Sequence, residues 1–166
     1  MSHRLVYCVL VPIFFLLGAC QGYDVTVNDK VVYTPVPLFN DFTTPDPGLN
    51  SCIKRAINDG VFTRADQLTS LDCSFAGIES LAGLAIFTEL KTLRLSANKV
   101  RNVVELGNLR ALEAAYLDDN QIIDPVPLYH LPLLRHVDLS GNPALQCPGP
   151  GSLAQVTTLI LPEHCR

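Results

Sequence analysis

The chain has 166 residues, with 12 Lys or Arg against 16 Asp or Glu, and its formal net charge is −4. This length suits one modest domain and a tail. The mild acidity argues against nucleic-acid binding and against a basic face that binds membranes. The sequence contains no CxxC or HExxH metal motif, no cysteine–histidine zinc spacing and no phosphate-binding loop. We therefore expect no metal and no cofactor.

The first twenty residues have the features of a secretory signal. An apolar stretch runs from Leu5 to Leu17, follows a positive head at Arg4 and contains Pro12. It is shorter than the roughly 20 residues that a membrane-spanning helix needs. A positive head, a short apolar run and small residues at its end predict a signal peptide over residues 1–19.

The end of this signal, Leu17-Gly18-Ala19-Cys20, resembles the lipobox of bacterial lipoproteins. The resemblance implies cleavage before Cys20, which then receives several acyl chains such as palmitate, enough for firm attachment to a membrane. Because Gln21 stands where an Asp would favour the inner membrane, the resemblance implies the outer membrane, with the protein facing the periplasm or the exterior of a bacterial cell envelope. The alternative is an ordinary signal cut after Ala19, which would leave Cys20 a spare thiol.

Residues 20–45 are expected to form a lipidated N-terminal segment. Strand-forming residues on both sides of Asn28 and Asp29 favour a hairpin. The proline-rich sequence that follows, PVPLFNDFTTPDPG, favours an extended linker. The sequence leaves open whether the hairpin packs on the rest of the chain.

Residues 46–67 are expected to form a helical cap in front of the repeats. Asp46 suits the N-cap of a helix, Pro47 its first turn and Gly60 its end. A further helical turn is indicated by the phrase TRADQL. One face of the helix is apolar and consists of Leu49, Cys52, Ile53, Ala56 and Ile57.

Five similar segments follow, over residues 68–166. They start near positions 68, 90, 112, 134 and 156, at a constant spacing of 22 residues. Their LxxLxLxxN pattern resembles that of leucine-rich repeats. Side chains alternate along a strand, so the fourth and sixth residues of each repeat enter a common core. The fourth-position residues are Leu71, Leu93, Ala115, Val137 and Leu159, and the sixth-position residues are Cys73, Leu95, Leu117, Leu139 and Leu161.

The implied fold class is an α/β solenoid, a right-handed leucine-rich-repeat coil with a parallel β-sheet on its concave face. A ladder of Asn98, Asn120 and Asn142 fills the ninth position, where amides can pair with backbone groups left open as the strand turns away. A repeat of 22 residues leaves little room for a helix on the convex side. In the third repeat, Pro125, Pro127 and Pro132 exclude a regular helix. We therefore expect short 3₁₀ or extended segments on the convex side.

The cap helix, the phrase TRADQL and the segment LTSLDCS resemble the N-terminal cap of internalins, which share this short repeat. Four cysteines in the cap and repeats allow three pairings. Cys52 lies on the cap helix and Cys73 in the first strand, whereas Cys147 lies in the fourth returning loop and Cys165 follows the last strand. We therefore predict the bridges Cys52–Cys73 and Cys147–Cys165. The alternative is that some of these cysteines are buried free thiols.

In this architecture the concave face is the usual binding surface, because neighbouring repeats align their outward side chains. Tyr116 flanked by Arg94 and Asp138 makes the kind of aromatic and charged patch that protein partners favour. The alternative is that these columns are polar only because they face water. The candidate partner-binding residues are Arg94, Tyr116, Asp118, Asp119, His136 and Asp138.

These observations favour a monomeric, lipid-anchored envelope protein that binds another macromolecule, in first place a protein of the envelope. The alternatives are a structural spacer or assembly factor without a discrete ligand, and a module that binds glycan or peptidoglycan. Catalysis is not expected, because no oxyanion turn or enclosed pocket accompanies the cluster of His136, Asp138, Asp118 and Ser140.

Overall fold

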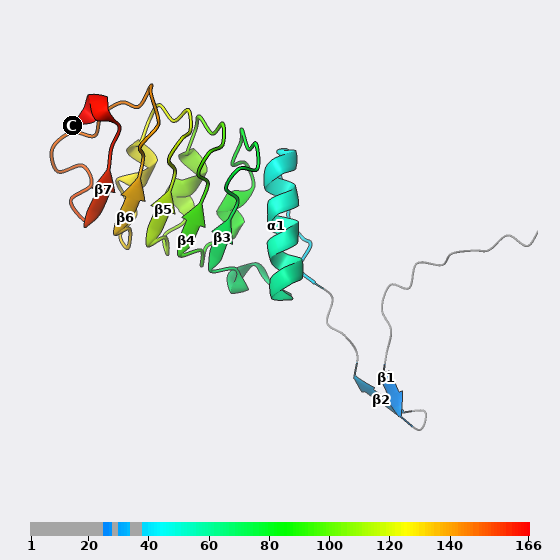
Figure 1. Ribbon diagram of the computed structural model, residues 1–166. Helices are drawn as coiled ribbons and strands as arrows, with labels where there is room; N and C mark the ends of the chain where they lie inside the picture. Colours follow the sequence, from blue (N-terminus) through cyan, green and yellow to red (C-terminus); the bar gives the residue numbers. More distant parts are fainter. Residues whose placement is uncertain (1–24, 28–29, 34–37) are drawn as a thin grey trace, which may run out of the picture. The chain divides into compact units, whose positions relative to one another are not determined.

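The computed structural model describes residues 25–27, 30–33 and 38–166 (Figure 1). The predicted signal peptide, the lipidation site at Cys20 and the hairpin turn at Asn28 and Asp29 lie outside the described residues. Within the part of the chain that the structure describes, no helix is both long enough and apolar enough to cross a membrane.

The chain divides into two compact units, Met1–Val36 and Pro37–Arg166. In the first unit, β1 (Val25–Val27) pairs antiparallel with β2 (Lys30–Tyr33). The second unit holds the cap helix and all five repeats, and it is the part of the protein that positions a candidate site.

The second unit begins its regular structure with the cap helix α1 (Pro47–Gly60). Asp46 is its N-cap and accepts a hydrogen bond from the Leu49 N–H at 2.9 Å. Gly60 is the last helical residue, but the left-handed residue that closes the helix is Val61, with φ 52°. A Cβ at position 60 would meet the tip of the Phe62 ring, which would then have to move.

Asp46 also fastens the cap helix to the first repeat. Its second carboxylate oxygen accepts hydrogen bonds from the N–H groups of Glu79 and Ser80 at 2.9 and 3.0 Å. Burial by itself would raise the pKa of Asp46, but the bonds from Leu49, Glu79 and Ser80 outweigh burial and hold the pKa below its ordinary value. One ionised side chain therefore caps α1 and clips it to the repeats.

Five short parallel strands stack in chain order and form one sheet (Figure 1). Corresponding residues of successive repeats pair, as in Leu71↔Leu93 and Ala115↔Val137, so the pairing register is the 22-residue period of the sequence. The strands are β3 (Ser70–Asp72), β4 (Thr92–Arg94), β5 (Ala114–Tyr116), β6 (His136–Asp138) and β7 (Thr158–Ile160).

The returning halves of the first three repeats contain short 3₁₀ turns, as the repeat length and the prolines of the third repeat predict. The turn in the third repeat includes Pro127 and follows Pro125. Two further 3₁₀ turns flank the repeats, one after the cap helix and one after the last strand. The five turns are η1 (Ala65–Gln67), η2 (Leu84–Ile86), η3 (Val104–Asn108), η4 (Val126–Leu128) and η5 (Glu163–Cys165).

The fourth- and sixth-position side chains form a continuous core with the apolar residues of the returning halves. The predicted inward residues of the first four repeats are buried. The last repeat differs, because no further repeat covers it: Leu159 is 38% exposed and Leu161 is only partly buried. The coil is thus well covered by α1 at its start and less covered at β7.

The asparagine ladder joins each repeat to the one before it. Asn120 donates from Nδ2 to the Leu95 carbonyl of the previous repeat and to the Leu117 carbonyl of its own, at 2.9 and 3.1 Å. Its Oδ1 accepts from the Val100 N–H at 3.0 Å. Asn98 and Asn142 make equivalent bonds one repeat away on either side.

The proline-rich segment is predicted to be an extended linker, and its described residues before α1 contain no helix or strand. From residue 38 onward the segment packs on the rest of the second unit. The Phe39 N–H donates to the Phe62 carbonyl at 2.8 Å. The rings of Phe39 and Phe42 lie 6.2 and 6.1 Å from the ring of Phe87, edge to face. Aromatic burial accounts for this packing, which the composition of the segment does not predict, because two phenylalanines on an extended backbone can cover an apolar surface.

Both predicted disulfide bridges are present in the structure. Cys52–Cys73 joins α1 to the end of the first strand, with a Cα–Cα distance of 5.7 Å. Cys147–Cys165 joins the loop after β6 to η5, with a Cα–Cα distance of 5.3 Å. One bridge therefore tightens each end of the repeat stack.

Replacement of Asn120 by Ala should lower the free energy of unfolding by about 3 kcal/mol, because it leaves several buried backbone groups without partners. Asn102→Ala is the matched control, since Asn102 is exposed and accepts one bond from the Val104 N–H. It should lower the free energy by less than about 1 kcal/mol. Urea unfolding followed by circular dichroism measures both, and equal losses would contradict a special role of the ladder.

The bonds of the Asp46 carboxylate to Leu49, Glu79 and Ser80, which we call the Asp46 clip, predict a specific pH dependence of stability. The folded-state pKa of Asp46 is lowered, so its stabilising contribution is present above the unfolded pKa of about 3.9 and is lost as pH falls through the folded pKa. The stability difference between wild type and Asp46→Asn should therefore shrink as pH is lowered from about 5 to about 2. Unfolding curves across this range measure it. Asp59→Asn, at an exposed position of α1, should keep the wild-type profile, and a difference that is constant with pH would exclude the clip.

Candidate functional site

The outward side chains of the five strands form one surface, which we call the sheet face. It consists of the third and fifth residues of each repeat, which lie on either side of the buried fourth residue. The strand register places Arg94 beside Tyr116 and Tyr116 beside Asp138. The complete set is Ser70, Asp72, Thr92, Arg94, Ala114, Tyr116, His136, Asp138, Thr158 and Ile160.

Three of these side chains stack across neighbouring strands. The guanidinium carbon of Arg94 lies 3.8 Å from the centroid of the Tyr116 ring. The Tyr116 and His136 rings have centroids 4.6 Å apart and an interplanar angle of 36°. A cation over an aromatic face is an attractive arrangement, and the two tilted rings are in contact. The Arg94–Tyr116–His136 stack therefore presents a semi-rigid surface at the middle of the sheet face.

His136 contributes an unusual feature to the stack. Its Nε2 atom is buried and has no hydrogen-bond partner in the described structure. Buried polar atoms are normally paired, so an unpaired one requires an explanation.

The carboxylates around the stack are oriented by serines. Asp138 accepts hydrogen bonds from the backbone and side chain of Ser140 at 3.0 and 2.7 Å. Asp118 accepts from the Ser96 hydroxyl at 2.6 Å. These bonds fix where the negative charges lie, and they turn Asp138 toward Ser140.

Asp72 has the same arrangement in the first repeat. The Ser74 backbone N–H and hydroxyl donate to it at 3.0 and 2.7 Å. These bonds, led by that from the backbone, outweigh the effect of burial and hold the pKa of Asp72 below its ordinary value, with a further contribution from the positive charge of Arg94. Asp72 is therefore an ionised group on the sheet face at neutral pH.

The predicted site residues do not all lie together. Arg94, Tyr116 and His136 form the stack, and Asp138 pairs with Tyr116 in the strand register. Asp118 follows β5 two residues after Tyr116 and is held by Ser96. Asp119 instead lies on the turn after β5, exposed and with a left-handed φ of 52°. No hydrogen bond among the described residues joins His136 to Asp138 or Ser140, so these side chains do not form a linked base, orienter and nucleophile.

One residue that the sequence analysis missed is Phe75, on the turn after β3. It is 82% exposed and has a left-handed φ of 57°. The signal was present in the repeat alignment, because the eighth position holds Ala97, Asp119 and Gly141 in the next three repeats. A large aromatic residue is out of place in that column.

A group of possible metal ligands occurs at the C-terminal end. Ligand atoms of Cys147, His164 and Cys165 lie within 4.8 Å of one another. However, the two sulfurs are joined in a disulfide, and His164 Nε2 is 3.0 Å from the Leu145 carbonyl. In this oxidised form the group offers no thiolate to a metal.

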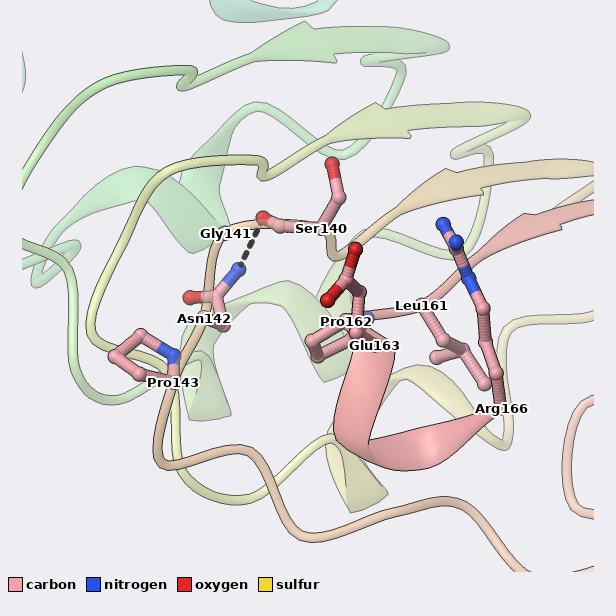
Figure 2. Close-up of a pocket in the computed structure, with 8 residues that line it drawn as sticks. All are labelled: Ser140, Gly141, Asn142, Pro143, Leu161, Pro162, Glu163 and Arg166. Carbon is pink, nitrogen blue, oxygen red and sulfur yellow. Dashed lines mark hydrogen bonds between the residues drawn. The ribbon is translucent and has the colours of Figure 1, made fainter.

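Two hollows that are open to solvent occur in the described unit. Figure 2 shows one of about 480 Å³ beside the ends of β6 and β7, where Asn142 is already held by backbone carbonyls, including that of Ser140 at 3.2 Å. Its lining residues are Ser140, Gly141, Asn142, Pro143, Leu161, Pro162, Glu163 and Arg166. The other, of about 500 Å³, lies on the returning side and is lined in part by Arg101 and Asp124. The sheet face, with its stack of Arg94, Tyr116 and His136, is the stronger candidate site.

The register, the asparagine ladder, the 3₁₀ returning turns and the helical cap define a leucine-rich-repeat solenoid of the internalin type. The chain is similar to an internalin (inlF) from Listeria monocytogenes, with 24% identity, a TM-score of 0.62, and coverage of 72% of this chain and 37% of that chain. At this identity the likeness shows the fold. The chain thus spans little more than a third of the length of that internalin.

Two other solved structures superpose less well. Internalin C2 from Listeria monocytogenes is 32% identical over 50% of this chain and 37% of that chain, with a TM-score of 0.47. The CBM51-2 and INT domains of ZmpB from Clostridium perfringens are 27% identical over 54% of this chain and 21% of that chain, with a TM-score of 0.43. No protein-family model and no curated protein sequence matches the chain.

Proposed function

We propose that the protein binds another protein through the sheet face, with the Arg94–Tyr116–His136 stack at the centre of the contact. The stack is the observation that carries the proposal, because Tyr and Arg are enriched among residues that dominate binding energy. The two stacked rings and the guanidinium are already held against one another. Little side-chain entropy is therefore lost when a partner binds.

The electrostatics of the face favour a basic partner. Asp72, Asp118 and Asp138 are held in position by serines, and Asp119 lies on the adjoining turn. Arg94 is the one cation on the sheet face as defined above. Lys and Arg side chains on the partner would meet this excess of negative charge and would accelerate association at low salt.

The alternative is a merely solvated surface, and it explains the stack less well. Strand positions that only face water carry separate polar side chains. Here a half-buried tyrosine and histidine stack on one another, and His136 Nε2 lies buried without a partner. A surface selected for solubility alone gains nothing from such an arrangement.

We also propose that the protein acts at a bacterial cell envelope, attached by acyl chains at Cys20 to the outer membrane and facing the periplasm or the exterior. The Leu17-Gly18-Ala19-Cys20 sequence and Gln21 support this proposal. Attachment would keep the sheet face near its partner at a membrane and would raise the effective concentration of the pair.

The double variant Arg94→Ala, Tyr116→Ala should weaken binding to the partner protein by about 30-fold or more, as expected when a central hot spot is removed. The partner is first identified by cross-linking in cells that make the protein, and the purified pair is then titrated by calorimetry. Arg110→Ala is the matched control, because Arg110 lies exposed on the returning half of the same repeat as Arg94. An unchanged affinity in a double variant with a wild-type circular dichroism spectrum would exclude the sheet face.

Cys20→Ser should release the protein from the membrane fraction, because no acyl chain can then be attached. Mass spectrometry of the N-terminal peptide should show a lipid-modified Cys20 in the wild type. Gln21→Asp should move the protein toward the inner membrane in density-gradient fractions. An unmodified wild-type N-terminus in the soluble fraction would exclude lipid attachment.

A further inference from the structure

The eighth residue of four successive repeats adopts the same left-handed backbone conformation. The φ values are 57° at Phe75, 55° at Ala97, 52° at Asp119 and 67° at Gly141. We call these four residues the rim, because each directly follows the outward seventh residue at the edge of the sheet. The rim conformation recurs whatever the side chain is, so it is imposed by the repeat.

Backbone hydrogen bonds explain why the conformation is imposed. The N–H of Phe75 donates to the Ser96 carbonyl at 3.0 Å, and the N–H of Ala97 donates to the Asp118 carbonyl at 3.0 Å. Asp119 makes the equivalent bond one repeat further on. Phe75, Ala97 and Asp119 are thus fixed to the next repeat, and they cannot relax to a conformation that suits their own side chains.

Phe75 is the rim residue least suited to this backbone. Left-handed φ values are easy for glycine and tolerated by aspartate, whereas a bulky side chain there is an outlier. The residue is 82% exposed, the largest value among the large exposed hydrophobic residues of the described structure. The ring therefore gains almost no burial that would offset the strain. Neither the stability nor the solubility of this chain accounts for a phenylalanine at position 75.

The surroundings of Phe75 indicate the chemistry that it would meet. Ser74, its neighbour, holds the ionised Asp72 carboxylate in the same repeat. Asp119 adds an exposed carboxylate to the same rim. An exposed ring next in sequence to the serine that holds an ionised carboxylate suits an apolar recess bordered by Lys or Arg, and Arg side chains can also stack on its face.

We propose that Phe75 is an anchor of the binding site: it inserts into an apolar recess, bordered by basic side chains, on the protein that the sheet face binds. This rests on the proposed function and extends the contact from the stack to the N-terminal end of the rim. An exposed aromatic anchor next to an oriented charged surface is the arrangement found at interaction hot spots. The favourable free energy of binding then offsets the backbone strain at Phe75.

The first experiment compares the stability of Phe75→Gly and Ala97→Gly in the full chain. Both replacements relieve a left-handed residue, and both lose some stability to the greater freedom of glycine in the unfolded state. The thermal midpoint of Phe75→Gly should rise by roughly 2–4 °C and should not fall below that of Ala97→Gly. A lower midpoint for Phe75→Gly would show that the ring supports the fold, and it would overturn the proposal.

The second experiment places the photo-cross-linker p-benzoylphenylalanine at position 75, 116 or 110 in cells that make the protein. Position 116 reports on the sheet face, and position 110 is the control on the returning side. We expect positions 75 and 116 to cross-link to the same protein, through a contact peptide at position 75 that contains Lys or Arg. With that partner purified, Phe75→Gly should weaken binding at least tenfold, whereas Ala97→Gly should keep wild-type affinity.

The outcomes separate the two proposals. Cross-linking at 116 without cross-linking at 75 overturns the anchor and leaves the sheet-face function in place. Cross-linking at neither position overturns both. A lipid adduct at 75, an acidic or uncharged contact peptide, or an unchanged affinity of Phe75→Gly each overturns the anchor.

Discussion

The structure depends on the register between repeats, and the buried asparagines maintain that register. Each amide bonds to a carbonyl in its own repeat and to a carbonyl in the repeat before it. The carbonyl oxygen of the same side chain accepts an N–H of the preceding returning segment. Because these groups are buried, a shift of one residue would leave several of them unpaired. The ladder therefore keeps successive repeats in the same register. The outward columns align for this reason, and the Arg94–Tyr116–His136 stack is a consequence of that alignment.

The two ends of the coil meet the problem of an exposed core in different ways. At the start, the buried face of α1 packs against the first repeat. The Asp46 clip and the Cys52–Cys73 bridge hold the helix in this position. At the other end, Cys147–Cys165 ties η5 to the last loop, but the core position Leu159 stays 38% exposed. The repeat pattern does not distinguish these cases, since Leu159 occupies the same position as the buried Leu93. Burial in a solenoid comes from the neighbouring repeat, and a terminal repeat lacks one neighbour.

Features that recur with the repeat could be predicted from the sequence, whereas contacts made only once could not. The strand register, the inward positions, the asparagine ladder and the disulfide pairs could all be predicted, because each recurs with the period or lies at a position that the period defines. Contacts made once along the chain could not. The packing of Phe39 and Phe42 on Phe87 belongs to no repeat, and the composition of the segment suggests only a linker. The bonds that Asp46 accepts from Glu79 and Ser80 could not be predicted from the local sequence either, because these partners are more than thirty residues away.

The candidate site was predictable to a smaller extent, and the reason is physical. The alternation of a strand places Arg94, Tyr116 and His136 on the outward face, but it does not say which of them touch. In the structure Tyr116 stacks with His136, while Asp138 turns to Ser140.

The rim shows the general relation between scaffold and function in this protein. The ladder fixes the backbone and the core positions, so the outward and rim positions are those where side chains can vary without loss of the coil. At the rim the backbone itself favours glycine, and Gly141 meets that preference, since a Cβ there would collide with Asp119. Ala97, Asp119 and Phe75 all depart from it, and of these only Phe75 carries a large exposed apolar side chain. A bulky apolar side chain at a strained position that the core does not need is the deviation for which the proposed anchor accounts.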